Sequence, residues 1–96
     1  MEVLLANTKS AIKRIRQSEK RRLRNRRVRS ETRTHIKRAR AQIEAGELDT
    51  AQSSVAVAVR ALDKAAEKGI IHKNNAARRK SRLMHKLSQA MQSAEA

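Results

Sequence analysis

The sequence predicts an all-α protein, an up-down-up three-helix bundle whose long, basic first helix projects beyond the other two. Three observations support this prediction. Pro is absent and Gly occurs only twice in 96 residues, so two points divide the chain into three helical stretches. Apolar residues recur at intervals of three and four. Short turns at the two glycines then require neighbouring helices to run antiparallel within a single domain, residues 1–96.

The first helix is expected over residues 8–45, after a disordered apolar lead at residues 1–6. Asn7 or Thr8 can cap it, because both side chains accept hydrogen bonds from backbone N–H groups. Its C-terminal half has a stripe that can be buried, made of Val28, Thr32, Ile36, Ala39 and Ile43.

The N-terminal half of this helix offers only Ile12, Ile15 and Leu23, which lie among cations. A helix over residues 8–45 would be about 57 Å long, against about 30 Å for each of the others. Roughly half of it must therefore project beyond the bundle. We expect that half to be largely disordered in the free protein, because its cations repel one another and it has few apolar contacts.

The second helix is expected over residues 48–68. Gly46 ends the helix before it, as a left-handed C-terminal residue would. Asp49 and Gln52 resemble a capping box, although Glu47 is an alternative cap. The residues that recur at helical spacing, and so form the predicted buried face, are Leu48, Ala51, Val55, Ala58 or Val59, Leu62, and Ala65 or Ala66.

The third helix is expected over residues 74–92. Gly69 ends the second helix, and Ile70 can make the apolar contact of a Schellman motif. Asn74 is a suitable N-cap. Two buried stripes are possible at helical spacing, either Leu83, Leu87 and Ala90 or Met84, Leu87 and Met91.

The charge of the chain points to a polyanionic partner. The net charge is +15, from 24 Lys and Arg against nine acids, and residues 9–29 contain eleven of these cations and one acid, Glu19. The chain cannot neutralise this charge internally, and nucleic-acid backbones are the densest source of negative charge in a cell. Residues 1–45 carry +11, residues 46–71 carry −1 and residues 72–96 carry +5. The first and third helices therefore form the predicted binding surface.

The chain contains no Phe, Tyr or Trp, which single-strand binders use to stack bases. Contacts to phosphate and sugar, which recognise the shape of a folded partner, are expected instead. The cations of the first helix fall on two stripes at helical spacing. One comprises Lys9, Lys13, Arg16, Lys20, Arg24 and Arg27, and the other Arg22, Arg26, Arg29, Arg33, Lys37 and Arg40. Two stripes suit a helix wedged between several phosphate backbones, as in a large folded RNA.

Other classes of function fit less well. His35, His72 and His85 lie apart in the sequence without nearby carboxylate clusters, Cys is absent, and there is no glycine-rich phosphate loop. No catalytic residue, metal site, cofactor or small-molecule substrate is predicted. No stretch is apolar enough to span a membrane, and the basic segment lacks an apolar face for insertion. A histone-like DNA-compacting protein remains an alternative, since it too binds without reading bases.

Two motifs resemble a known family. Ala6-Asn7-Thr8-Lys9-Ser10-Ala11, followed by Arg21-Arg22-Leu23-Arg24-Asn25-Arg26, is similar to the opening of protein twenty of the bacterial small ribosomal subunit. Residues 68–83, Lys-Gly-Ile-Ile-His-Lys-Asn-Asn-Ala-Ala-Arg-Arg-Lys-Ser-Arg-Leu, resemble the most recognisable stretch of that family. The likeness spans about residues 6–91. Met1 to Leu5 are a departure, because members usually begin at the equivalent of Ala6 directly after the initiator Met.

The resemblance implies a three-helix bundle that binds directly to small-subunit ribosomal RNA, in its 5′ domain, and supports early assembly. It further implies a cytoplasmic monomer within the ribosome, with other ribosomal proteins as peripheral partners only. Combined with the charge pattern, it gives the predicted RNA-binding residues. They are Lys9, Lys13, Arg14, Arg16, Lys20, Arg21, Arg22, Arg24, Asn25, Arg26, Arg27, Arg29 and Arg33 in the first helix, and His72, Lys73, Asn74, Arg78, Arg79, Lys80 and Arg82 around the start of the third.

Overall fold

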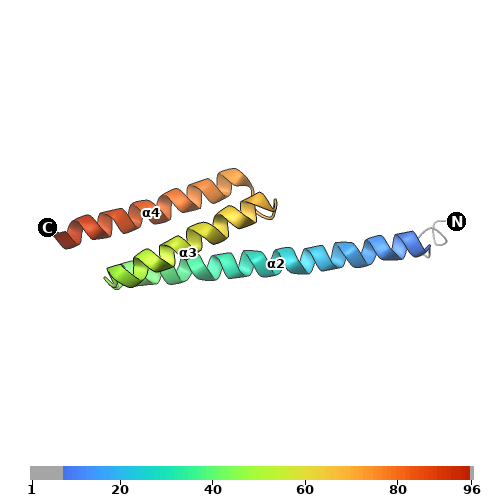
Figure 1. The fold of residues 1–96 in the computed structure, drawn as a ribbon, viewed down its shortest axis with the longest axis horizontal. Coiled ribbons are helices and arrows are strands. Elements are labelled where there is room, and N and C mark those ends of the chain that lie inside the picture. The colour runs from blue at the N-terminus through green and yellow to red at the C-terminus, as the bar shows by residue number, and fades with distance from the viewer. Residues whose placement is uncertain (1–7, 96) are drawn as a thin grey trace.

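Three helices make up the protein in a computed structural model that describes residues 8–95 (Figure 1). Helix α2 spans Lys9–Glu44, α3 spans Leu48–Glu67 and α4 spans Lys73–Glu95. Helices α2 and α4 run in the same direction and α3 runs against both (Figure 1). The predicted all-α, up-down-up bundle is confirmed. The expected lead at residues 1–6 lies outside the described residues.

Both glycines end a helix with a Schellman motif. Gly46 has φ +79°, its N–H donates to the Ile43 carbonyl at 3.1 Å, and the Glu47 N–H donates to the Gln42 carbonyl at 3.0 Å. At the second turn Gly69 has φ +74°, and the Ile70 N–H donates to the Ala65 carbonyl at 2.9 Å. A positive φ strains residues with a Cβ, so glycine at these positions fixes where the helices end.

The first residues of the helices and their caps agree only in part with those predicted from the sequence. Thr8 caps α2, accepting the Ala11 N–H at 3.2 Å, as predicted. The predicted capping box at Asp49 is wrong, because α3 already begins at Leu48. Its N-cap residue is Glu47, whose side chain makes no capping hydrogen bond. Asp49 instead places negative charge in the first turn, where the helix dipole favours it.

Asn74 is not the N-cap of α4, because that helix begins one residue earlier, at Lys73. His72 performs this function instead: its Nδ1 accepts the backbone N–H of Asn74 at 3.1 Å. The end of α4 also differs from the prediction, since the helix continues to Glu95 rather than stopping at residue 92.

A small aliphatic core holds the three helices together. It consists of Ile36, Ala39, Ile43, Ala51, Val55, Ala58, Leu62, Ala76 and Leu83. Ala39, Ala51 and Ala58 have no exposed surface, so helix backbones can approach closely at these points. Leu62 is the largest fully buried side chain. Burial of these residues is the main stabilising contribution to the bundle.

The structure distinguishes between the two stripes predicted for α4. Leu83 is buried, and Leu87 and Ala90 pack against the core. Met84 is 51% exposed, so the alternative stripe that included it is wrong. In α2 the expected stripe is buried from Thr32 to Ile43, while Val28 is only half-buried. The hydroxyl of buried Thr32 donates to the Val28 carbonyl at 2.8 Å, which satisfies it inside the core.

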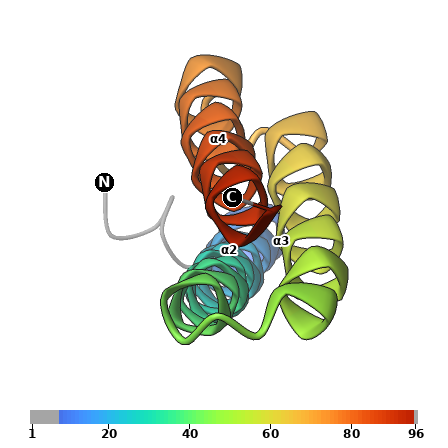
Figure 2. The same ribbon diagram turned by 90° about the vertical axis from the view of Figure 1, so that its left-hand side faces the viewer.

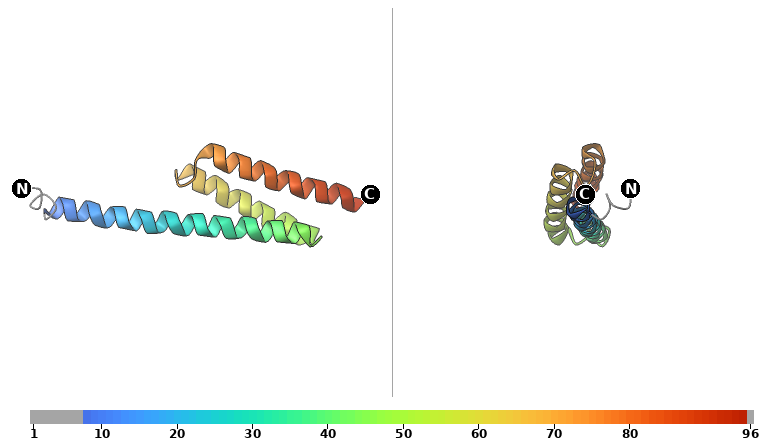
Figure 3. Two further views of the ribbon diagram at one scale, coloured as in Figure 1. Left: turned by 180° about the vertical axis from the view of Figure 1, so that it is seen from behind. Right: turned by 90° about the vertical axis from the view of Figure 1, so that its right-hand side faces the viewer.

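The first half of α2 extends beyond the bundle, as Figures 1 and 3 show from opposite sides. Every residue from Ile12 to Arg24 is exposed, and the side chain of Leu23 is 61% exposed. The molecule measures 73 × 21 × 15 Å. Its Cα radius of gyration is 19.4 Å, against about 12 Å for a compact domain of this length. We call residues 9–24 the projecting half of α2.

In the free protein we expect the backbone amides of the projecting half to exchange hydrogen far faster than those of residues 32–43. In the projecting half, the helix is stabilised only by its own backbone hydrogen bonds, and repulsion between cations three and four residues apart opposes them. Residues 32–43 contribute to the core, so their amides exchange only when the core unfolds. Hydrogen-exchange mass spectrometry measures this difference directly. Equal protection of the two segments would show that the projecting half is stable on its own.

Candidate nucleic-acid interface

A groove runs between α2 and α4 because α3 packs against both helices while α2 and α4 make the fewest contacts with each other. Viewed along the bundle, the three helices lie at the corners of a triangle (Figure 2). Two open cavities occupy the groove. One of about 220 Å³ lies beside the α3–α4 turn, and one of about 360 Å³ lies further along α2 and α4.

Two rows of cations line this groove. Arg29, Arg33 and Arg40 come from α2, and Arg79, Arg82 and Lys86 come from α4. We call these six residues and the space between them the α2–α4 groove. The α2 row, from Arg29 to Arg40, covers about 16 Å of helix. The groove thus brings together cations of α2 and α4 that lie at least 39 residues apart in the sequence.

Hydrogen bonds position the cations at the turn end of the groove. The Nη2 of Arg29 donates to the carbonyl of Ile70 at 3.3 Å, which ties the α3–α4 turn to α2. The Nε of Arg79 donates to the Oδ1 of Asn75 at 2.7 Å. Each guanidinium keeps further N–H donors that can bind a phosphate. The two arginines are therefore partly preorganised for an anion.

The other end of the groove contains an internal ion pair. The Nζ of Lys86 lies 2.6 Å from the Oε1 of Glu44. This hydrogen bond, together with the charges of Lys86 and Arg40, lowers the pKa of Glu44 below its usual value of 4.5. Among the described residues that line the two cavities, Glu44 is the one acid. The potential of the groove is thus most positive near the turn.

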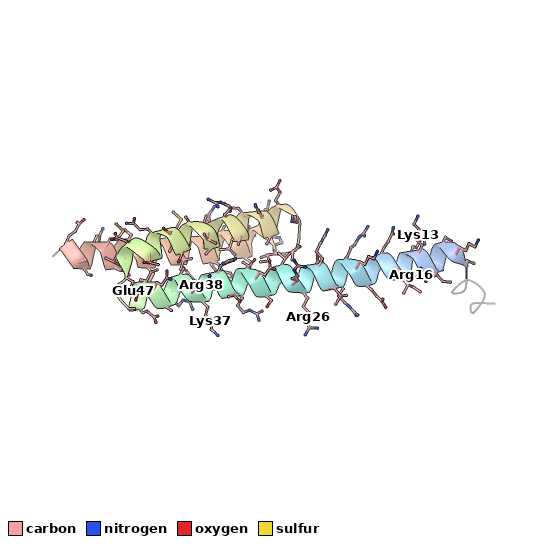
Figure 4. All side chains as sticks on the ribbon, turned by 60° about the horizontal axis from the view of Figure 1, so that its bottom comes forward. Lys13, Arg16, Arg26, Lys37, Arg38 and Glu47 are labelled. Atoms are coloured by element: carbon pink, nitrogen blue, oxygen red, sulfur yellow. The ribbon has the colours of Figure 1, made fainter. Side chains whose placement is uncertain are left out.

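The α2 row continues beyond the bundle. Arg26 and Arg22 lie three and seven residues before Arg29, on the same side of the helix. Figure 4 shows Arg26 and Lys37 projecting from α2 on the side away from α3 and α4. The second cationic stripe of the sequence is therefore divided: Arg29, Arg33 and Arg40 line the groove, whereas Arg26 and Lys37 point away from α3 and α4.

The first stripe lies on another side of α2. Its members, Lys9, Lys13, Arg16, Lys20, Arg24 and Arg27, are all exposed, and so are Arg14 and Arg21 between them. In Figure 4, Lys13 points to the opposite side from Arg26. Arg27 forms an exposed ion pair with Glu31 at 3.2 Å, which contributes little to stability in water. The projecting half can therefore contact anions on more than one side.

The remaining predicted residues lie outside the groove or at its rim. His72 lines the cavity at the turn, and Lys73, Asn74 and Arg78 are exposed on the first turns of α4. Lys80 faces α3, where its Nζ lies 3.1 Å from Asp63. Asn25 is half-buried, and the structure gives its buried Oδ1 no hydrogen-bond partner.

Two cations of the groove, Arg40 and Lys86, were not among the predicted residues, and neither was Asn75, which lines the cavity at the turn. A signal for Arg40 was present, since it lies on the second cationic stripe of the first helix. Lys86 lies four residues after Arg82, and Asn75 lies four before Arg79, so both continue the face of α4 that meets the groove. Their inclusion requires knowing which face of α4 turns towards α2.

The rest of the described surface differs in character. The exposed side of α3 mixes acids with cations, which matches the −1 charge of residues 46–71. Within residues 8–95, no group of three His, Cys, Asp or Glu side chains is arranged to hold a metal ion. None of the three described helices is both long and apolar enough to cross a membrane.

Comparison with known proteins places the chain in a family. Residues 6–88 match the family described as ribosomal protein S20, which is most of the chain and includes both basic segments. The chain belongs to the ribosomal protein S20 family. Members of this family are structural proteins of the small ribosomal subunit, so the sequence resemblance is confirmed. The match begins at Ala6, and residues 1–5 lie outside it.

Individual members of the S20 family are similar over nearly the same range. The small ribosomal subunit protein bS20 of Thermomicrobium roseum is 57% identical over 84 residues, which cover 88% of this chain and 85% of that protein. The bS20 protein of Beutenbergia cavernae is 51% identical over 84 residues, covering 88% and 98%. That of Saccharophagus degradans is 52% identical over 83 residues, covering 86% and 94%. The sequence similarity thus extends over most of the chain rather than over one motif.

Proposed function

We propose that this protein is a structural constituent of the small ribosomal subunit that binds small-subunit ribosomal RNA directly, through contacts dominated by phosphate. The α2–α4 groove is the main support for this proposal, because it places six cations from two helices around two open cavities. Arginine guanidinium groups bind phosphate oxygens in paired hydrogen bonds. Contacts of this kind read the path of an RNA backbone and not its base sequence.

The projecting half of α2 has a distinct place in this function. Its exposed cations on several sides, with no buried residue from Ile12 to Arg24, suit insertion between RNA helices. Phosphates would neutralise the repulsion between these cations and so stabilise the helix. The bundle would bind one region of the RNA, and the projecting half would contact further RNA segments and hold them together. Such bridging supports RNA folding during assembly of the subunit.

The proposed RNA-binding function also implies which partners the protein has and where it acts. A site formed by one chain needs no second copy, so the protein would act as a monomer within the cytoplasmic ribosome. Its other ribosomal-protein neighbours would be peripheral, since the cationic surfaces are committed to RNA. The predicted residues outside the groove, among them Lys73, Asn74 and Arg78, would contact RNA at its rim. No catalytic step, cofactor or small-molecule substrate belongs to this proposal.

Competition between nucleic acids tests the proposal. The protein would first be bound to labelled RNA of the small-subunit 5′ domain. We expect unlabelled RNA of the same sequence to compete for the protein, while duplex DNA at equal phosphate concentration competes far less. The widely spaced cationic surfaces fit a folded RNA better than a single straight duplex. Equal displacement by DNA would instead favour a histone-like compacting function. Retention on small subunits through a moderate salt wash provides a second, independent measurement.

Salt dependence tests the mechanism. If six or more phosphates are neutralised, the logarithm of the association constant should fall with the logarithm of salt concentration with a slope of about −4 or steeper. Each single Arg→Ala change in the α2–α4 groove should reduce that slope by about one unit or less. Filter binding at several salt concentrations gives both values. A flat dependence would contradict phosphate-dominated binding.

A further inference from the structure

We propose that the cavity beside the α3–α4 turn binds a single RNA nucleotide whose base has left its stack. We call it the turn cavity. This inference rests on the proposed RNA-binding function and adds a ligand of defined chemistry at one place within it. The turn cavity measures about 220 Å³ and contains, besides the cations Arg29, Arg33 and Arg79, an aliphatic wall.

The aliphatic wall separates the turn cavity from the rest of the interface. Its accessible part is the half-buried Ile71 at the edge of the cavity, and behind it lie Ile36, Leu62 and Ile70, which are buried in the bundle, Leu62 completely. The second cavity of the groove has one aliphatic residue, Leu83, among four charged ones. Phosphate binding needs no aliphatic wall, and apolar surface lowers the free energy of binding only when it covers an apolar ligand face. The planar face of a nucleobase is such a surface.

The polar groups around this wall match the other parts of a nucleotide. Arg29 and Arg79 are held by hydrogen bonds to Ile70 and Asn75, and their remaining donors can bind the phosphate. Because the Oδ1 of Asn75 accepts from Arg79, the amide NH₂ of Asn75 is left to donate to an acceptor on the base edge. Arg33 can stack its guanidinium plane on the base.

His72 adds a donor at the rim. Its Nδ1 accepts the N–H of Asn74, so in the neutral ring the proton is on Nε2. That N–H can donate to a ribose hydroxyl or a phosphate oxygen. The turn cavity therefore combines an apolar wall for a base face, an amide for its edge, and cations for its phosphate.

A base that remains in a duplex cannot use this combination. Stacking hides both faces of each base and leaves only edges in the grooves, so contact with the aliphatic wall requires an unstacked nucleotide, as at a bulge or loop. The chain has no aromatic residue to stack on such a base. Ile71 and Arg33 would replace the usual aromatic platform.

Fluorescence of a bulged nucleotide tests this inference. Two hairpin RNAs would be compared, identical except that one carries a single bulged 2-aminopurine and the other is fully paired. We expect the protein to bind the bulged RNA about tenfold more tightly, a factor that corresponds to roughly one hydrogen bond gained at the base edge. The 2-aminopurine fluorescence should rise on binding, because the base leaves its stack and the protein has no aromatic residue to quench it.

A pair of matched variants localises the effect. Ile71→Asn makes the wall polar without changing the charge and should remove both the preference and the fluorescence rise. Met84→Asn, at a residue that is 51% exposed on α4, should change neither. Circular dichroism would verify that both variants fold.

Each outcome separates this inference from the proposed function. If the unaltered protein binds both hairpins equally, or Ile71→Asn keeps the preference, the turn cavity does not hold the nucleotide, although RNA binding stands. If the unaltered protein binds neither hairpin nor RNA of the small-subunit 5′ domain, the proposed function fails as well.

Discussion

Replacing Arg29, Arg33 and Arg79 together by Glu is expected to weaken binding to small-subunit ribosomal RNA by about a thousandfold or more. These residues bring cations from α2 and α4 into one cavity, so the change removes three charged donors and adds three repelling carboxylates. A charged hydrogen bond contributes about 1.5–3 kcal/mol, and three such losses already correspond to this factor. Filter binding with RNA of the 5′ domain would measure the effect.

A matched triple variant separates the groove from net charge. Arg60, Lys64 and Lys68 are exposed on or directly after α3, away from the α2–α4 groove. Their replacement by Glu also changes the net charge by six units, from +15 to +9. We expect this variant to lose far less affinity, since only long-range attraction is reduced. Equal losses in the two variants would mean that RNA senses the total charge of the protein and not the groove.

Leu62→Ala is expected to lower the free energy of unfolding by about 2–5 kcal/mol. Leu62 has no exposed surface and is the largest fully buried side chain of the described residues. Its loss leaves a cavity between helices whose other core contacts are mostly from alanine and valine. Small domains are stabilised by only about 5–15 kcal/mol, so the variant should be close to unfolding at 37 °C. Urea titration followed by circular dichroism gives the value.

Met84→Ala is the control for this core variant. This substitution removes a large apolar side chain from the neighbouring helix, but half of the surface of Met84 is already exposed to water. We expect the free energy of unfolding of the Met84→Ala variant to differ from that of the unaltered protein by no more than about 0.5 kcal/mol, as for most exposed positions. A loss as large as that of Leu62→Ala would show that Met84 is packed in solution, as the alternative sequence stripe suggested.

The fold was largely predictable from the sequence because its determinants are local. Gly46 and Gly69 end helices through their own backbone conformation, and their partners in the turns lie within six residues. The buried stripe from Thr32 to Ile43 follows from helical spacing alone. Caps were less predictable, since His72 and Asn74 lie only two residues apart and both side chains can accept the required hydrogen bond. The position of the helix start decides between them, and tertiary packing sets that position.

The interface was predictable only in its two halves. Charge identified both basic segments, but which cations of α2 and α4 meet in the groove depends on how far α4 is rotated about its axis relative to α2. That rotation follows from which of Leu83 and Met84 enters the core, a choice that spacing left open. The same rotation directs Lys80 towards Asp63 and Lys86 towards Glu44. Arg40 and Lys86 become recognisable as groove residues only once it is known.

The alanines at the helix contacts have a consequence for how the sequence can evolve. Ala39, Ala51 and Ala58 have no exposed surface, and their small volume sets the distance between helix axes. A methyl group added at Ala58 would overpack the core and lower the free energy of unfolding by about 1–3 kcal/mol. It would also change the distance between the two rows of cations in the α2–α4 groove. Under the proposed function, selection on these alanines would thus follow the spacing of the RNA backbone as well as the stability of the protein.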